Sequence, residues 1–272
     1  MNENDFESIT IIYPEYEALK EEVAKKRTEL SMLFLERDNL IYQENKNIEM
    51  EYLLAVGDLE YKVFELDNEV RRKKREVELI QAQVNRHQTI LIEQINEQLD
   101  REFELFQELL DDQLDKMNSA IERSHGTLLS KEETKEMKKL YRIIIKELHP
   151  DLHPDLSEAQ KRLFLNAVNS YEKGDLNDLR IIATMVGKSD FPEPTDDAMS
   201  ELEKEEQRLT ELLESVKKEI SKIKTEFPYT MKEFVNDPEK IKKKQDELQQ
   251  QLDQLAEFNI MYDHKINEML GN

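Results

Sequence analysis

The sequence predicts an all-α protein in which long coiled-coil helices flank a small helical hairpin. Glycine and proline, the residues that most often interrupt regular structure, number only 5 and 7 among 272 residues. Charged residues make up 37% of the chain, and apolar residues recur over long stretches at the three- and four-residue spacing of packed helices. We expect four consecutive regions: an N-terminal helical coiled-coil region at 1–125, the hairpin module at 126–188, a linker at 189–195, and a C-terminal antiparallel helical hairpin or coiled coil at 196–272.

The N-terminal region is expected to begin with two long antiparallel helices. A β-prone run at 9–13 precedes them and would either pack on the helices or form a small edge strand. Helices over 16–44 and 48–84 each carry one apolar stripe, with a turn in the polar stretch 44–47 between them. Because a single helix cannot bury its own stripe, we expect these two helices to pack against each other.

A basic run and a third apolar stripe complete this region. Five consecutive basic residues at 71–75 point in all directions around a helix, which favours a solvated coiled-coil surface over a binding patch for an acidic partner. After a break at 85–88, the third stripe consists of Leu99, Phe103, Phe106, Leu110, Leu114, Met117 and Ile121. Phe103 and Phe106 are interpreted as core residues rather than as a surface for clients. His87 and His125 have no clustered ligands and are interpreted as structural or surface residues.

The hairpin module opens with a helix predicted over 135–148 that has two opposite faces. One face is an apolar stripe formed by Met137, Tyr141, Ile144 and Leu148. The opposite face is cationic and carries Lys135, Lys138, Lys139, Arg142 and Lys146. Pro150 cannot continue the helix and forces the residue before it out of helical conformation. The helix is therefore expected to end at an exposed turn, His149-Pro150-Asp151.

A second short helix is predicted to pack on the apolar stripe of the first. Ser157 is a favourable N-cap, Ser130 and Glu133 form a possible capping box for the first helix, and Gly174 is placed to end the second. The apolar face of the second helix consists of Leu163, Phe164, Ala167, Val168 and Tyr171. The predicted core of the module is Tyr141, Ile144, Leu148, Phe164, Ala167, Val168 and Tyr171.

The hairpin resembles the J-domain, the module by which DnaJ-type co-chaperones engage DnaK-type heat-shock chaperones. The residues that carry this resemblance are Leu140-Tyr141-Arg142, then His149-Pro150-Asp151, and later Phe164 through Ala167 to Tyr171-Glu172. The match is limited to the hairpin, and the flanking coiled coils match no family that we can name. At 121–129 the sequence departs from the short Tyr-x-x-Leu helix and glycine-containing loop with which a J-domain normally begins.

The resemblance implies a partner and a set of docking residues. The partner is a DnaK-type chaperone ATPase, and the residues implied to contact it are His149, Pro150, Asp151, Lys138, Lys139, Arg142 and Lys146. The coiled coils would then bind a protein client or a second copy of the chain. The alternative is a coiled-coil scaffold or adaptor with a degenerate, non-stimulating J-like module. The intact tripeptide and the cationic face favour the co-chaperone, whereas the departure at 121–129 favours the scaffold.

The chain beyond the hairpin is expected to add three more helices. A short one over 175–186 would point Leu176, Leu179, Ile182 and Met185 inward, and Gly187 would end it. After the linker, two apolar stripes at 199–223 and 241–269 indicate a second antiparallel hairpin or a dimerising arm. Asp237 followed by Pro238 is a typical start for the last of these helices.

Composition argues against several classes of function. A formal net charge of -22 disfavours nucleic acid and anionic membranes as partners. The chain has no cysteine, no phosphate-binding glycine loop and no nucleophile motif, so we expect no enzyme and no cofactor. His149, Asp151, His153 and Asp155 lack a third histidine or a thiolate nearby, so no metal site is expected there. An acidic N-terminus and the lack of a long apolar run indicate a cytoplasmic protein.

Overall fold

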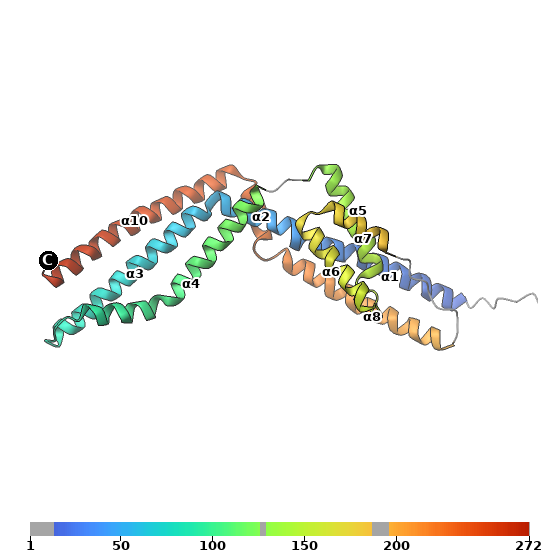
Figure 1. The fold of residues 1–272 in the computed structure, drawn as a ribbon, viewed down its shortest axis with the longest axis horizontal. Coiled ribbons are helices and arrows are strands. Elements are labelled where there is room, and N and C mark those ends of the chain that lie inside the picture. Colours follow the sequence, from blue (N-terminus) through green and yellow to red (C-terminus); the bar gives the residue numbers. More distant parts are fainter. Residues whose placement is uncertain (1–13, 126–128, 187–195, 272) are drawn as a thin grey trace, which may run out of the picture. The chain divides into compact units, whose positions relative to one another are not determined.

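The computed structural model describes residues 14–125, 129–186 and 196–271, and these residues are all-α, without a strand (Figure 1). The predicted fold class is therefore confirmed for this part of the chain. The β-prone run at 9–13, Gly187 and the predicted linker lie outside the described residues.

The helical contacts divide the chain into two compact units. The first unit combines residues 1–45 with 128–226, and the second combines residues 46–127 with 227–272. Each unit is thus assembled from two segments that are far apart in sequence, which differs from the four consecutive regions expected above.

Helical conformation runs without a turn from Pro14 to Asn85. The segments are α1 (Pro14–Asn39), the π-helical η1 (Leu40–Glu44), α2 (Asn45–Tyr52), the π-helical η2 (Leu53–Gly57) and α3 (Asp58–Asn85). The turn predicted at 44–47 is wrong, because polar residues are compatible with a solvent-facing helix and do not by themselves end one. The two π-helical segments each absorb extra residues, which shifts the direction in which the apolar stripe points.

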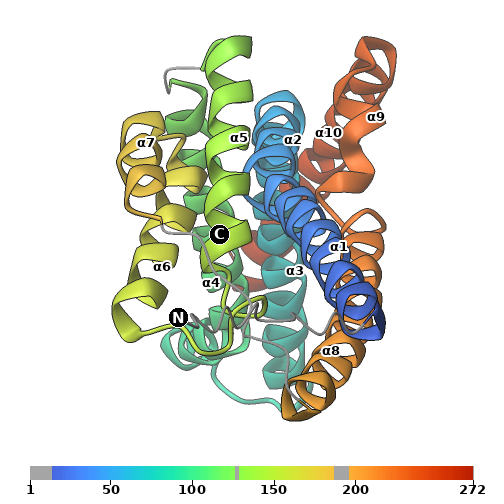
Figure 2. The same cartoon turned by 90° about the vertical axis from the view of Figure 1, so that its right-hand side faces the viewer.

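The first unit pairs α1 with α8 (Asp196–Ile223), and the two helices lie side by side in both views (Figures 1 and 2). Their interface is apolar along its centre, where α8 buries Leu202, Leu209, Leu213, Val216 and Ile220. Ion pairs flank it: Lys26 with Glu206, Arg27 with Glu205 at 2.9 Å, Lys217 with Glu29 at 2.8 Å and Lys224 with Glu36 at 2.6 Å.

The hairpin module belongs to this first unit. It consists of α5 (Lys131–Leu148), α6 (Glu158–Lys173) and α7 (Leu176–Met185), and α5 packs on α1 as well as on α6 and α7. α7 buries Leu176, Leu179 and Ile182 as predicted, but Met185 is 64% exposed, so its predicted inward direction is wrong.

The second unit is built from α3, α4 (Ile92–Ser124) and α10 (Pro238–Leu270), preceded by the short η3 (Tyr229–Met231) and α9 (Lys232–Val235). α3 packs along α10 and also contacts α4 (Figure 1). One end of the unit is held by a core of Val77, Ile80, Ile95, Leu99 and Ile266. Asp237 caps α10 by accepting hydrogen bonds from the backbone N–H groups of Glu239 and Lys240, as predicted.

The predicted pairings of the long helices are therefore wrong. The helix at 16–44 was expected to pack on the one at 48–84, and the two C-terminal stripes were expected to form either an antiparallel hairpin or a dimerising arm, but α1 pairs with α8 and α3 pairs with α10. An apolar stripe shows that a helix needs a partner without specifying which one. The ion pairs between α1 and α8 join residues 178 or more positions apart, and such matches are not visible in either stripe alone.

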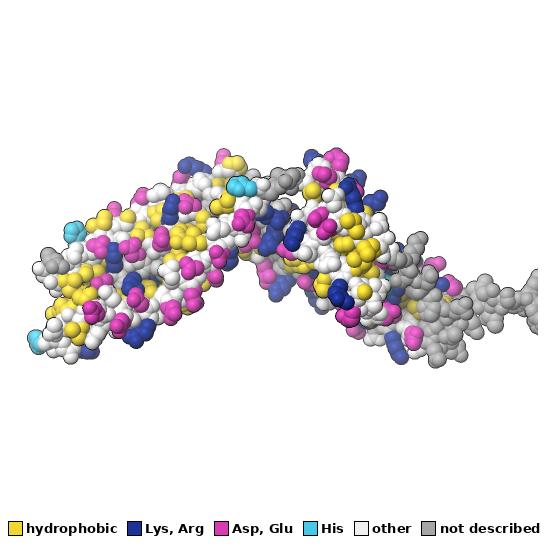
Figure 3. Space-filling model, in the orientation of Figure 1, with side chains coloured by type: hydrophobic (Ala, Val, Ile, Leu, Met, Phe, Trp, Pro, Cys, Tyr) yellow, Lys and Arg dark blue, Asp and Glu magenta, His cyan; other side chains and the backbone are white. Residues whose placement is uncertain are grey.

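The apolar stripe predicted for α4 is less buried than expected. Phe103 and Phe106 are half-buried and line a groove of about 710 Å³ between these helices, and hydrophobic side chains are visible between α3 and α4 in Figure 3. Leu114 and Ile121 are exposed, so the predicted stripe of α4 is not buried beyond Leu110 as continuously as expected.

In the basic run, Arg71, Arg72, Lys73 and Arg75 form ion pairs with carboxylates of the same unit, which agrees with the predicted solvated surface.

Candidate functional site

The site is built on two capped helices and the turn between them. The Ser130 hydroxyl accepts a hydrogen bond from the backbone N–H of Glu133, and the Glu133 carboxylate accepts one from the N–H of Ser130, which completes the predicted capping box of α5. Ser157 and Gln160 form the equivalent box on α6. Gly174 ends α6 with a φ of 73°, a left-handed conformation that favours glycine.

A tyrosine stack forms the core that joins this hairpin to α1. The rings of Tyr141 and Tyr171 lie 4.1 Å apart and nearly parallel, and both side chains are fully buried. The Tyr141 hydroxyl donates a 2.8 Å hydrogen bond to the buried carboxylate of Asp38, and burial together with this carboxylate raises the pKa of Tyr141. Six of the seven predicted core residues are buried, and Val168 is half-buried.

The cationic face of α5 is open. Lys139, Arg142 and Lys146 are exposed and Lys138 is half-buried, and none of the four forms an ion pair with any residue that the structure describes. The nearest internal ion pair on this helix is the one between Glu136 and Arg180, at 2.8 Å, which fastens α7 to α5. Figure 3 shows Lys and Arg side chains at the surface over α5. The face is thus free to meet negative charge from outside.

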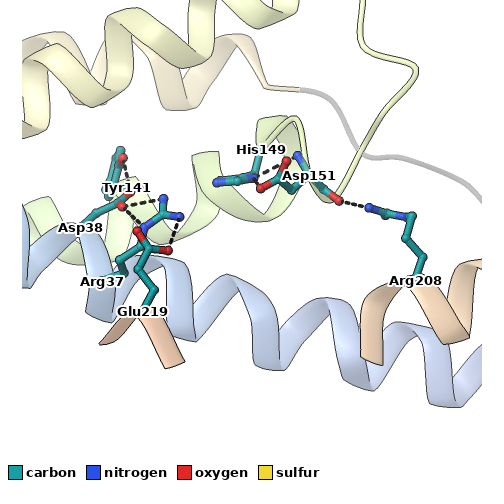
Figure 4. A network of polar contacts seen from close by, with 7 residues as sticks. All are labelled: Arg37, Asp38, Tyr141, His149, Asp151, Arg208 and Glu219. Atoms are coloured by element: carbon teal, nitrogen blue, oxygen red, sulfur yellow. Dashed lines mark hydrogen bonds and ion pairs between the residues drawn. The ribbon is translucent and has the colours of Figure 1, made fainter. Parts of the chain in front are cut away.

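The His149 side chain is buried, which corrects the expectation of a fully exposed turn. Only 5% of its surface is accessible, because the imidazole stacks on Phe34 of α1 with ring centroids 3.7 Å apart and planes 8° apart. Its edge meets the ring of Phe164 at 5.0 Å. Within the turn, the backbone N–H of Asp151 donates a 3.1 Å hydrogen bond to Nδ1 of His149 (Figure 4).

The remaining residues of the turn are more accessible. Pro150 is half-buried, and the side chain of Asp151 is 53% exposed. The Asp151 carbonyl oxygen accepts a 2.6 Å hydrogen bond from Nη1 of Arg208 on α8 (Figure 4). The seven predicted docking residues therefore share one end and one face of α5, but His149 points into the fold.

The His-Pro-Asp tripeptide occurs a second time, as His153-Pro154-Asp155, and its histidine has a structural role. His153 is buried, and its Nε2 lies 2.8 Å from the carbonyl oxygen of Lys146 in the last turn of α5. A neutral imidazole that donates from Nε2 satisfies a carbonyl that has no partner within the helix.

Sequence reasoning also missed Phe34, Arg37, Asp38 and Arg208. Phe34 and Asp38 lie one turn apart on α1, where the stripe of that helix predicts only a coiled-coil partner. The single signal available was the pair of charges at Arg37 and Asp38 within an apolar pattern. Arg37 pairs with Asp38 at 2.8 Å, lies 3.6 Å from Glu219 of α8, and covers the face of the Phe34 ring with its guanidinium 4.9 Å from the centroid.

Burial first, and then the neighbouring groups Arg37 and His153, lower the pKa of His149 to about 3. The unfolded chain binds a proton at His149 near pH 6.5, whereas the folded chain does so only near pH 3, so acid favours unfolding. We expect the free energy of unfolding of the first unit to fall by about 2 kcal/mol between pH 7 and pH 5 through this residue. Chemical denaturation at both pH values should show a smaller fall in His149→Gln, and an unchanged one in the exposed control His264→Gln. Equal falls in all three proteins would contradict the assignment.

Comparison with known proteins gives no relative: no family model, no curated protein and no solved structure matches this chain. Within the described residues, no group of three His, Asp or Glu side chains is arranged to hold a metal ion. None of the helices described has the length and apolar character needed to cross a membrane.

Proposed function

We propose that this protein is a J-type co-chaperone that engages a DnaK-type ATPase through the cationic face of α5 and the His149-Pro150-Asp151 turn. The observation that supports this most is the open cationic face, which ends at that turn and forms no ion pair with any residue that the structure describes. A helix that only packs against its neighbours has no need for four such cations on one side.

The cations would bring the two proteins together, and the turn would act after contact. Lys138, Lys139, Arg142 and Lys146 span more than two helical turns, so they present a strip of positive charge rather than a single point. Such a strip meets an acidic surface and raises the association rate, an effect that salt weakens. His149, Pro150 and Asp151 would then supply the specific contacts. ATP hydrolysis belongs to the partner, and the chain itself contributes no catalytic residue.

In this proposal, the second unit selects the protein client or the cellular location. Its groove between α3 and α4, lined by Phe103, Phe106 and Leu110, is large enough to accept side chains of a protein client or of a second copy. In this proposal the protein acts in the cytoplasm, where DnaK-type chaperones are present.

A scaffold with a non-stimulating J-like module is the second candidate. The burial of His149 against Phe34 favours it, because a residue held inside the fold cannot contact a partner in that state.

Titrating the chain into the DnaK-type ATPase from the same cell, at low and at physiological salt, tests the proposal. We expect saturable binding that weakens as salt rises, with ATP turnover above the basal rate. Absence of binding even at low salt would reject the co-chaperone and leave the scaffold.

A further inference from the structure

The turn that would contact the chaperone is closed from two sides by other parts of the first unit. We propose that α1 and α8 form an intramolecular cover over the His149-Pro150-Asp151 turn, and that stimulation of the chaperone ATPase requires the turn to leave this cover. The inference rests on the proposed function and adds a means of regulating the same site.

Phe34 provides the first half of the cover. Its ring lies flat on the imidazole of His149 at 3.7 Å, and Phe164 meets the imidazole edge at 5.0 Å. With only 5% of His149 accessible, a partner cannot reach the imidazole unless Phe34 moves away. On its other face, Phe34 carries the guanidinium of Arg37 at 4.9 Å, and Arg37 is itself held by Asp38 and Glu219 (Figure 4).

Arg208 provides the second half. It donates a 2.6 Å hydrogen bond to the carbonyl oxygen of Asp151, so the backbone of the turn is held by α8 as well as by α1 (Figure 4). Arg208 also pairs with Glu205 at 2.7 Å, and Glu205 pairs with Arg27 of α1 at 2.9 Å. The ion pair between Glu205 and Arg27 therefore joins α8 to α1 close to the hydrogen bond between Arg208 and the turn.

The turn can be released without unfolding the unit, because other contacts anchor the hairpin to the N-terminal helix. The Tyr141 hydroxyl is bonded to Asp38, and the side-chain amide of Gln43 donates a 2.6 Å hydrogen bond to the Tyr171 carbonyl oxygen. Tyr141 lies eight residues, about two turns, before His149. The cationic face stays exposed throughout, so a partner can bind there while the turn is still covered.

A chemical measurement that does not involve the chaperone tests the cover itself. Diethyl pyrocarbonate acylates accessible neutral imidazoles, and mass spectrometry can follow each of the 5 histidines separately. We expect the rate at His149 to rise at least tenfold in Phe34→Ala and severalfold in Arg208→Ala, with the exposed His264 of the second unit as the internal reference. Val23→Ala is the matched control, because it removes a buried side chain from α1 three turns before Phe34.

The same proteins are then assayed for ATP turnover with the cognate DnaK-type chaperone. We expect Phe34→Ala and Arg208→Ala to stimulate turnover severalfold more than the wild type, and Val23→Ala to match the wild type. Where circular dichroism shows that Phe34→Ala has lost its fold, Arg208→Ala decides, since it removes the hydrogen bond to the turn and the ion pair with Glu205 but no buried apolar side chain.

The outcomes separate the two proposals. Wild type that stimulates as strongly as both variants, or variants in which His149 reacts no faster, would overturn the cover and leave the co-chaperone intact. Faster reaction of His149 together with no binding and no stimulation by any variant would overturn the co-chaperone, and with it the regulatory role of the cover.

Discussion

Reversing Arg142 and Lys146 to glutamate should weaken binding of a DnaK-type ATPase by about fourfold to several hundredfold at low salt. An exposed ion pair is worth about 0.2–1 kcal/mol, and replacing an attraction by a repulsion roughly doubles the change for each of the two residues. Both side chains are exposed and form no ion pair among the described residues, so the fold should not be affected. Affinity measured by calorimetry or surface plasmon resonance should fall mainly through the association rate.

The chain offers a closely matched control for this experiment. Arg162 and Lys173 are exposed on α6, and Lys173 lies in the last turn of its helix as Lys146 does in α5. Changing Arg162 and Lys173 to glutamate alters the net charge of the protein by the same amount, and Lys173→Glu reverses a charge in the last turn of its helix as Lys146→Glu does. Comparable losses in both double variants would indicate a non-specific charge effect and count against a docking face on α5.

Tyr141→Ala should have the largest effect on stability. The side chain is fully buried, stacks on Tyr171 and donates a hydrogen bond to the buried carboxylate of Asp38. Removing a large buried aromatic side chain costs about 3–5 kcal/mol, and leaving Asp38 without this donor adds about 1–3 kcal/mol. We expect the first unit to lose its cooperative unfolding transition. Near-UV circular dichroism, which reports on packed tyrosine side chains, is the measurement that checks this.

Tyr141→Phe separates the two contributions. It retains the ring and removes only the hydroxyl, so the unit should remain folded and lose about 1–3 kcal/mol. A Tyr141→Phe variant as stable as the wild type would show that the contact with Asp38 contributes nothing to the fold.

Local features of the module were predictable because they depend on neighbours in sequence. The caps at Ser130 and Ser157, the left-handed Gly174, and the opposite apolar and cationic faces of α5 all follow from residues within one or two helical turns. The resemblance to a J-domain depended on the same short-range spacing.

Long-range features were not predictable, for reasons that particular residues make clear. Phe34 and His149 lie 115 positions apart, and an aromatic residue on a coiled-coil stripe gives no sign that it will cover an imidazole. The partner of α1 was equally hidden, because the apolar stripes of α3 and α8 have similar spacing, and the charges that pair with α1 lie outside the stripe of α8. His149 was expected to be exposed since proline-containing turns usually lie at the surface, and here α1 covers the turn.

The central claim is tested most directly by ATP turnover of the cognate DnaK-type chaperone in the presence of Phe34→Ala and of Phe34→Ala combined with Asp151→Asn. The second change is nearly isosteric and lies on a side chain that is 53% exposed, so it leaves the fold unchanged. We predict that Phe34→Ala stimulates turnover and that the added Asp151→Asn returns it to the basal rate. Equal stimulation by the two proteins would contradict the account.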